Sequence, residues 1–263
     1  MARETIERHN QDPTLQAPEF SVPETYNAQV YMMAMFRYES HYIGLPMMFY
    51  RSAEVPPDWE GFESLDLSPE VRQRLSRNGD WTGIHVIQLT CSRDLKSWER
   101  LGDRAPFIAP SKLDSGAYDT QTLGTQGRPV VHGDELWFYY TGLKRYAIVS
   151  EDKTDYGAVC LAVLRRDGFV SLDSDDGEGT VLTQPFTVPG GRLSVNVDAS
   201  HGALHVEAVE PDGAVVARSA AVTGDQPNTN VRWEDGDISE WTGRQLSLRF
   251  TLRKARLYSY WLE

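Results

Sequence analysis

The chain has 263 residues, of which 40% are hydrophobic and 11% aromatic. This composition provides for a sizeable core and is too apolar for a disordered chain. The 38 acidic and 26 basic residues give a formal net charge of −12. Such a surface argues against nucleic acid and against anionic membranes as partners, because both require clustered lysine and arginine.

Targeting signals and cofactor motifs are absent from the sequence. Residues 1–20 are charged and contain no apolar segment, so no signal peptide is recognisable. No window approaches the roughly 20 apolar residues of a membrane span, and we expect a soluble chain whose compartment stays open. Cys91 and Cys160 lie inside apolar runs and are expected to be buried core thiols. No metal spacing and no phosphate or dinucleotide loop occurs, so we expect neither a metal nor a cofactor.

Only one segment carries the signals of a helix. In residues 67–76, Ser68 can cap the helix, Pro69 suits its first turn and Glu70 favours its dipole. We expect a short inserted helix near residues 66–76. Elsewhere, short apolar runs are broken by Gly, Asp, Asn and Pro, which is typical of an all-β chain.

Two rounds of one strand pattern occur before residue 175. The first comprises residues 26–38, 41–52 and 84–98, and the second comprises residues 119–131, 134–142 and 157–172. Each round has a strand with a polar start, an aromatic strand, and an apolar strand that ends in Arg-Asp before a turn. A repeated unit with a turn at a fixed place is typical of a propeller blade.

The stretch "SRDLKSW" at residues 92–98 poses a choice between an active-site loop and a structural turn. Asp94 and Asp167 occupy equivalent positions in the two rounds. We therefore interpret the stretch as a blade turn, in which Asp94 is a buried acceptor of backbone N–H groups and Trp98 packs beneath it. The hairpin of the second round is expected to turn at Gly133-Asp134.

From about residue 183 the pattern becomes a strict alternation of apolar and polar residues. Turns are expected at His201-Gly202 and at Asp212-Gly213. This pattern predicts an antiparallel β-sandwich over residues 183–263. The acidic residues 173–179 lack a calcium-loop signature and are interpreted as a solvated linker.

The predicted fold is therefore all-β, with an incomplete β-propeller of about two blades at residues 1–180 and the β-sandwich at residues 183–263. Propellers have 4–8 blades. Because an incomplete propeller leaves sheet edges open, we expect a homo-oligomer or a companion chain that completes it.

Several phrases carry a family resemblance, and they cover most of the chain from about residue 26: "SRD…W", "DSG", "GDELWFYYTG", "RRDGFVSL", "LSVNVDAS", "VRWEDGDIS" and "LRFTLRKARLYSY". The sequence resembles bacterial proteins related to glycoside hydrolase families 32 and 43, in which a five-bladed propeller precedes a β-sandwich. The resemblance implies a glycosidase with three acids at the propeller axis: a nucleophile or base, a stabilising aspartate and a general-acid glutamate. The blades that carry at least one of these acids are not among the two recognised. We therefore expect either that this chain is the C-terminal part of a longer protein of this architecture or that copies associate to complete the ring.

Two-carboxylate hydrolysis of a glycoside requires carboxyls about 5–5.5 Å apart for retention or roughly 6.5–9.5 Å apart for inversion. Candidate carboxylates stand where the first strand of a round begins, and they are Glu24, Asp114 and Asp119. Asp119 is preferred because a polar, strand-like segment follows it, whereas Asp114 can instead shape a turn. For any single one of the three, a solvated loop carboxylate is the favoured interpretation. Candidate sugar-binding groups, which combine aromatic faces and amides, are Tyr26, Asn27, Gln29, Tyr118 and Gln121.

Three functions stay open at this point. The first is a metal-independent glycoside hydrolase-like enzyme that acts on furanosides or related glycans. The second is a non-catalytic carbohydrate-binding protein, and the third is an assembly module. Catalysis requires two inward carboxyls, whereas binding requires only an aromatic floor with polar partners.

Trp137, Tyr139 and Tyr140 are assigned to the core between blades, and His85 and His132 to structure. Lys144 and Arg145 can contact a carboxylated sugar, although an exposed rim pair is the default interpretation.

Overall fold

The computed structural model describes residues 27–60, 63, 69–112, 115–120, 122–125, 127–144 and 157–263. Over these ranges the protein is all-β, as predicted, and its antiparallel sheets are open rather than closed. By its internal contacts the chain divides into two compact units, residues 1–130 with 137–162 and residues 131–136 with 163–263. No helix in the described ranges is long and apolar enough to cross a membrane.

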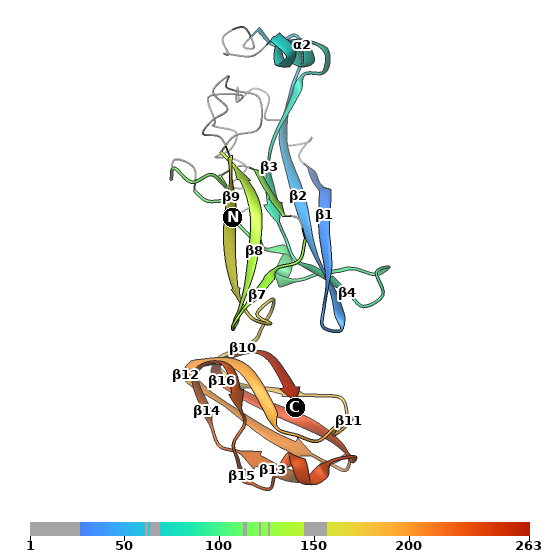
Figure 1. The fold of residues 1–263 in the computed structure, drawn as a ribbon, viewed down its shortest axis with the longest axis vertical. Coiled ribbons are helices and arrows are strands. Elements are labelled where there is room, and N and C mark those ends of the chain that lie inside the picture. Colours follow the sequence, from blue (N-terminus) through green and yellow to red (C-terminus); the bar gives the residue numbers. More distant parts are fainter. Residues whose placement is uncertain are drawn as a thin grey trace. The chain divides into compact units, whose positions relative to one another are not determined.

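The first sheet is centred on the long strand β2 (His41–Val55), which follows β1 (Asn27–Tyr38) through a tight turn (Figure 1). Strand β2 pairs with β1 on one edge and with β3 (Asp80–Ile87) and β4 (Thr90–Ser92) on the other. The short β5 (Glu99–Arg100) pairs antiparallel with β4 and forms the edge of the sheet. Helix α2 (Pro69–Asn78) lies between β2 and β3 in sequence, so the expected short helix is present.

The stretch "SRDLKSW" forms the turn between β4 and β5. The Oδ1 atom of Asp94 accepts hydrogen bonds from the backbone N–H groups of Lys96 and Ser97, each at 2.8 Å. Trp98 packs on β2 so closely that a Cβ at Gly44 would lie 2.8 Å from its ring. The interpretation as a structural turn is confirmed. The expectation that the Asp94 carboxylate is buried is wrong, because its side chain is exposed to solvent at the turn.

The second sheet is centred on β8 (Glu135–Leu143), which pairs with β6 (Thr122–Thr125), β7 (Val130–His132) and β9 (Gly157–Arg165). The hairpin from β7 to β8 turns at Gly133-Asp134 as expected, with Gly133 at a φ of 59°. Within the first unit, the Phe138 ring of β8 packs against Phe36 of β1 and against Phe107, at centroid distances of 6.3 and 5.5 Å. Aromatic packing therefore joins the two sheets of this unit.

The second unit is built on two long strands, β12 (Leu193–Val209) and β16 (Gln245–Leu262). Strand β16 lies between β10 (Leu172–Leu182) and β12 and also pairs with β11 (Phe186–Thr187). Strand β12 also pairs with β13 (Val215–Ser219) and β14 (Val222–Asn230), and β13 pairs with β15 (Trp233–Asp235). A short 3-10 helix (Ile238–Trp241) precedes β16.

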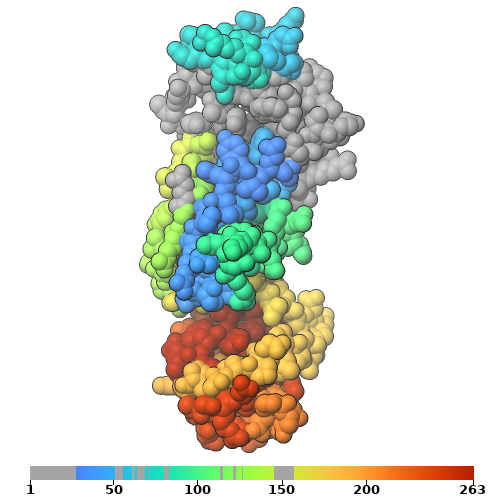
Figure 2. Space-filling view, turned by 90° about the vertical axis from the view of Figure 1, so that its right-hand side faces the viewer, coloured from blue at the N-terminus to red at the C-terminus, as the bar shows by residue number. Residues whose placement is uncertain are grey.

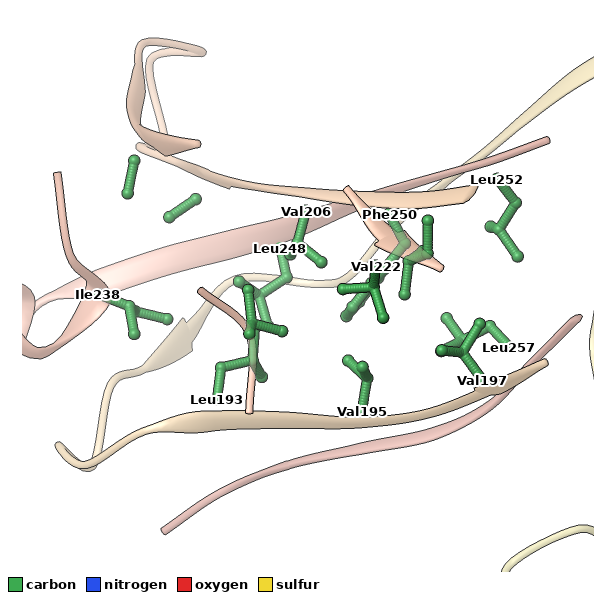
Figure 3. Packing of buried hydrophobic residues seen from close by; sticks show 14 of the residues in the cluster. Leu193, Val195, Val197, Val206, Val222, Ile238, Leu248, Phe250, Leu252 and Leu257 are labelled. Atoms are coloured by element: carbon green, nitrogen blue, oxygen red, sulfur yellow. The ribbon is translucent and has the colours of Figure 1, made fainter. Parts of the chain in front are cut away.

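The core of this unit lies between the two halves of β12. In Figure 3, Leu193 and Val195 of the first half face Val206 of the second half and Phe250 of β16 across the core. These four side chains are at most 1% exposed. Apolar residues alternate along both strands, and this alternation places one face of each strand in the core.

Two expectations for this unit are wrong. Residues 173–179 are not a linker, because they belong to β10 and pair with β16 on both sides of a bulge between Ser174 and Glu178. His201-Gly202 is not a hairpin turn, because it lies within β12 where the register with β16 shifts. A Cβ at Gly202 would lie 1.8 Å from the carbonyl oxygen of Arg253, so glycine permits the close approach of two strands there. The Asp212-Gly213 turn is confirmed.

Both sheets of the first unit have an outer strand with exposed apolar side chains. Within the described ranges, β1 pairs with β2 alone and β9 pairs with β8 alone. Val30 and Met35 of β1 are 61% and 51% exposed, and β1 lies on the surface in Figure 2, where it is blue. Val159 of β9 is 78% exposed.

The cysteines are free thiols but only half-buried, which corrects the expectation of buried core thiols.

Candidate functional site

Asp119 is a buried carboxylate at the entrance to β6, with 8% of its surface exposed. Its backbone carbonyl accepts a hydrogen bond from the N–H of Ser111 at 3.0 Å. The next residue, Thr120, donates its hydroxyl proton to the backbone carbonyl of Lys144 at 3.1 Å. The backbone around Asp119 is therefore attached to the segment that follows β8, and the carboxylate has a defined position.

The partner of this carboxylate is the phenol of Tyr140 on β8. Tyr140 Oη donates to Asp119 Oδ2 at 2.6 Å, and the tyrosine is 8% exposed. Burial, followed by the hydrogen bond to Asp119, raises the pKa of Tyr140 well above its usual value, so the phenol stays a proton donor. No ion pair joins Asp119 to a cation within the described ranges. A buried carboxylate without a cationic partner is costly unless it is hydrogen-bonded, so the bond from Tyr140 stabilises Asp119 in this position.

Gly142 and Cys160 close the space behind Asp119. A Cβ at Gly142 would lie 2.8 Å from the Cβ of Asp119 and 2.9 Å from the Sγ of Cys160, so only glycine fits on β8 there. Burial, and then the charge of Asp119, raise the pKa of the Cys160 thiol. A protonated, half-buried thiol is a weak nucleophile, so Cys160 fills space in this cluster.

Tyr118 and Lys144 form the more exposed side of the cluster. Lys144 Nζ lies 4.2 Å from the centre of the Tyr118 ring, and both side chains are half-buried. The ammonium group therefore covers one face of the ring in a cation–π contact. A buried acid, its phenol donor, an aromatic ring and an ammonium group thus come from two short segments, residues 118–120 and 140–144.

The other sequence-predicted site residues are placed less completely. Glu24, Asp114, Tyr26 and Gln121 lie outside the described residues. Asn27 begins β1 opposite Arg51, and Gln29 is exposed on β1 opposite Phe49, in the first sheet. Of the predicted residues, Asp119 and Tyr118 are the two that the structure brings into one cluster.

Sequence reasoning missed the roles of Tyr140 and Gly142 at this site. The sequence assigns Tyr140 to the core between blades, and the residue is buried, but its hydroxyl also donates a hydrogen bond to Asp119. The same assignment is wrong for Tyr139, which is 51% exposed. The alternation along β8 places Phe138, Tyr140 and Gly142 on one face. A polar hydroxyl followed two residues later by a glycine on that buried face is the signal that could have found them.

His85 is a structural residue, as the sequence indicated. It is 2% exposed, stacks on Phe49 at a centroid distance of 4.8 Å and meets the edge of Tyr31 at 5.2 Å. Burial lowers its pKa to about 4. The imidazole is therefore neutral at neutral pH, and its aromatic surroundings resemble a core rather than a catalytic centre.

The second unit has a separate polar groove of about 760 Å³ where β10, β12 and β16 bulge. Both of its cations pair with carboxylates of β10: Lys254 with Asp176 at 2.6 Å, and Arg256 with Asp173 at 3.5 Å. Among the residues that the structure describes, no group of three or more His, Cys, Asp or Glu side chains is arranged to hold a metal ion. The groove is thus a weaker candidate than the Asp119 cluster.

Comparison with known proteins adds little to this geometry. No protein-family model matches the sequence, and no curated protein matches it. Among solved structures, a match is found to a glycoside hydrolase family 43 arabinoxylan arabinofuranohydrolase from Bacillus subtilis, in complex with cellotetraose. The match has 10% sequence identity and a TM-score of 0.23, and it covers 88% of this chain and 53% of that chain. The chain thus spans about half the length of that protein, and at this score the similarity assigns no activity to it.

Proposed function

We propose that this chain is a glycoside hydrolase-like protein that acts on furanosides or related glycans, with Asp119 as one of its acid/base carboxylates. The buried Asp119 carboxylate, held by Tyr140 at 2.6 Å and not paired with a described cation, carries the proposal. The sequence resemblance supplies the class of reaction. In this assignment β1–β5 and β6–β9 are two propeller blades within residues 1–180, and residues 183–263 form the sandwich.

The proposed chemistry uses Asp119 to transfer a proton to or from the glycosidic oxygen or an attacking water. Tyr140 engages Oδ2, and in the proposed mechanism Oδ1 is the oxygen that gives or takes the proton. A second carboxylate, for which Glu24 and Asp114 are the candidates, would have to lie about 5–5.5 Å or roughly 6.5–9.5 Å away. Tyr26, Asn27, Gln29, Tyr118 and Gln121 are the proposed substrate-binding groups, and the proposed mechanism uses no cofactor.

A non-catalytic carbohydrate-binding protein is the second candidate. The observation that favours it is the contact between Tyr118 and Lys144, an aromatic ring and a charge that can serve recognition without chemistry. Binding requires only such a polar and aromatic surface.

The proposal is tested with the full chain and a panel of aryl furanosides and pyranosides. We expect Asp119→Asn to lower kcat/KM by about a hundredfold or more, because acid/base groups contribute roughly 10²–10⁴-fold. Asp134→Asn, which removes an exposed carboxylate at the β7–β8 turn, is the matched control and should keep full activity. Full activity in Asp119→Asn would remove this residue from the mechanism. A wild-type protein that binds glycans without cleaving any would establish the binding function instead.

We also propose that the open edges of the first unit are completed by a second copy of the chain or by a companion chain. The exposed apolar residues Val30 and Val159 on the two outer strands support this proposal. Unpaired strand edges of this kind are templates for association. Light scattering of the purified chain should show an oligomer or aggregation-prone species, and a stable, well-folded monomer would contradict the proposal.

A further inference from the structure

Strand β9 has one outer edge that no described strand covers. Within the described ranges it pairs with β8 alone, and Figure 1 shows it as an outer strand beside β8. In the first sheet, the chain returns after the Asp94 turn as β5 and pairs with β4. After the equivalent turn at Asp167, the chain instead continues into β10, which pairs with β16. The outer edge of β9 thus lacks the neighbour that its counterpart in the first sheet has.

The composition of β9 is that of a strand buried on both faces. Residues 158–164 form an uninterrupted apolar run. Strands covered on both faces have such runs, whereas a strand with one solvated face alternates between apolar and polar residues. Yet Val159, Leu161 and Val163, which lie on one face, are 78%, 43% and 53% exposed. The sequence of β9 therefore indicates more burial than a single chain provides.

The other outer strand, β1, is less suited to pairing with a further strand. Its register shifts between Val30 and Met32, and Arg37 adds a charge, and both features discourage edge-to-edge association. Strand β9 contains no proline, and its first charged residue is Arg165 at its end. Because each chain has a net charge of −12, two copies repel each other, and contact is favoured at a strand without charges. Of the two strands, β9 is the one open to a partner.

The sequence of β9 is nearly symmetrical about Leu161. Val159 and Val163 stand two residues to either side of it, and the small residues Cys160 and Ala162 flank it directly. In an antiparallel pair of two β9 strands centred on Leu161, Val159 of each copy lies opposite Val163 of the other. Apolar residues then face apolar residues across the pair, where opposite Cβ atoms are about 4.5–5.5 Å apart. Such a self-complementary edge fits a two-fold contact between identical chains.

We infer that the outer edge of β9 binds the same edge of a second copy of this chain, antiparallel and with Leu161 on the two-fold axis. The inference rests on the proposed association of chains and names its edge, its partner and its register. It does not depend on the proposed hydrolysis of glycans. The pairing joins the second sheets of the two copies into one continuous sheet and closes both exposed edges.

The test measures the mass and the dissociation constant of the full chain by light scattering and analytical ultracentrifugation. The wild type should have twice the mass of one chain. Leu161→Lys removes the central leucine of both strands and opposes two like charges, so the dissociation constant should rise by about a hundredfold or more. Leu161→Asp should act in the same way, and an equimolar mixture of the two variants should recover the dimer because unlike charges then meet. Val30→Lys, which replaces an exposed apolar residue of β1, is the matched control and should leave the wild-type dimer intact.

The possible outcomes separate this inference from the broader proposal of association. A monomeric wild type would overturn both. An oligomer that persists in Leu161→Lys, or that Val30→Lys dissociates, would overturn the inference and leave association through another edge. A mixture of folded variants that stays monomeric would overturn the register at Leu161. Leu161→Thr keeps a β-branched residue in the strand and decides the question if circular dichroism shows that the charged variants unfold, since an unchanged dissociation constant would then overturn the inference.

Discussion

Replacing Tyr140 with phenylalanine removes one oxygen atom from the centre of the Asp119 cluster. The ring stays in place, so packing changes little. Asp119, only 8% exposed, loses the donor that lies 2.6 Å from Oδ2. Hydrogen bonds to charged groups contribute about 1.5–3 kcal/mol, and a buried acceptor left without its donor loses most of that amount. We therefore expect Tyr140→Phe to lower the free energy of unfolding by about 2 kcal/mol.

The assay is urea denaturation of the full chain at neutral pH, followed by tryptophan fluorescence. Tyr139→Phe is the control, because this neighbour on β8 is 51% exposed and should change stability by less than about 0.5 kcal/mol. The pH dependence gives a second signature. The pKa of Tyr140 is higher in the folded protein than in the unfolded chain, where it is near 10. The phenol therefore contributes fully to stability below about pH 10, and this contribution is lost as the pH rises further. The difference in free energy of unfolding between the wild type and Tyr140→Phe should thus become smaller in strong alkali. Equal stability of the two variants at neutral pH would refute the reasoning.

Three further predictions concern other parts of the molecule. Burial lowers the pKa of His85 from 6.5 to about 4, so the free energy of unfolding of the wild type should fall by up to about 3 kcal/mol as the pH drops from 6.5 to 4. In urea denaturation at pH 4.5 and pH 7, His85→Phe should show a smaller difference in stability between the two pH values than the wild type does. Arg165 donates a hydrogen bond to the side-chain oxygen of Asn196, which is 1% exposed. In urea denaturation, Arg165→Ala should lower the free energy of unfolding by about 2–3 kcal/mol, and Arg165→Lys should have a stability between those of Arg165→Ala and the wild type. Asp94 accepts two backbone N–H bonds that lower its pKa, so Asp94→Ala should lower the melting temperature at neutral pH but not at a pH below the carboxyl range. Glycan binding unchanged by Asp94→Ala would fit its place in a turn, and altered binding without a change in melting would contradict it.

Local chemistry in the sequence was enough to predict most of the secondary structure. Period-two alternation identified the strands, and Gly133 and Gly213 marked turns that need a positive φ. The turn role of Asp94 followed from its position, which is equivalent to that of Asp167 in the second round. These features depend on neighbouring residues, so sequence reasoning can reach them.

The errors arose where distant strands decide the outcome. Residues 173–179 look like a solvated linker because they are acidic, yet β16 pairs with them from about 75 residues away in the chain. The bond from Tyr140 to Asp119 spans 21 residues and depends on the register between β6 and β8. Nothing in the local pattern fixes that register. The candidate site could therefore be predicted as a carboxylate at a strand start, but its donor and its glycine could not.

The position of β16 between β10 and β12 has a consequence for synthesis on the ribosome. Leu172 of β10 pairs with Leu257 of β16, and Leu193 of β12 pairs with Leu262 of β16. Neither β10 nor β12 can form these pairs before β16, the last of the three strands, has been synthesised. Until β16 leaves the exit tunnel, the edges of β10 and β12 that pair with it have no partner strand. Folding of this unit therefore follows translation of β16 as a single late event, with the slow kinetics of long-range strand pairing. During that delay the unpaired edge of β12 is a template for pairing with strands of other chains.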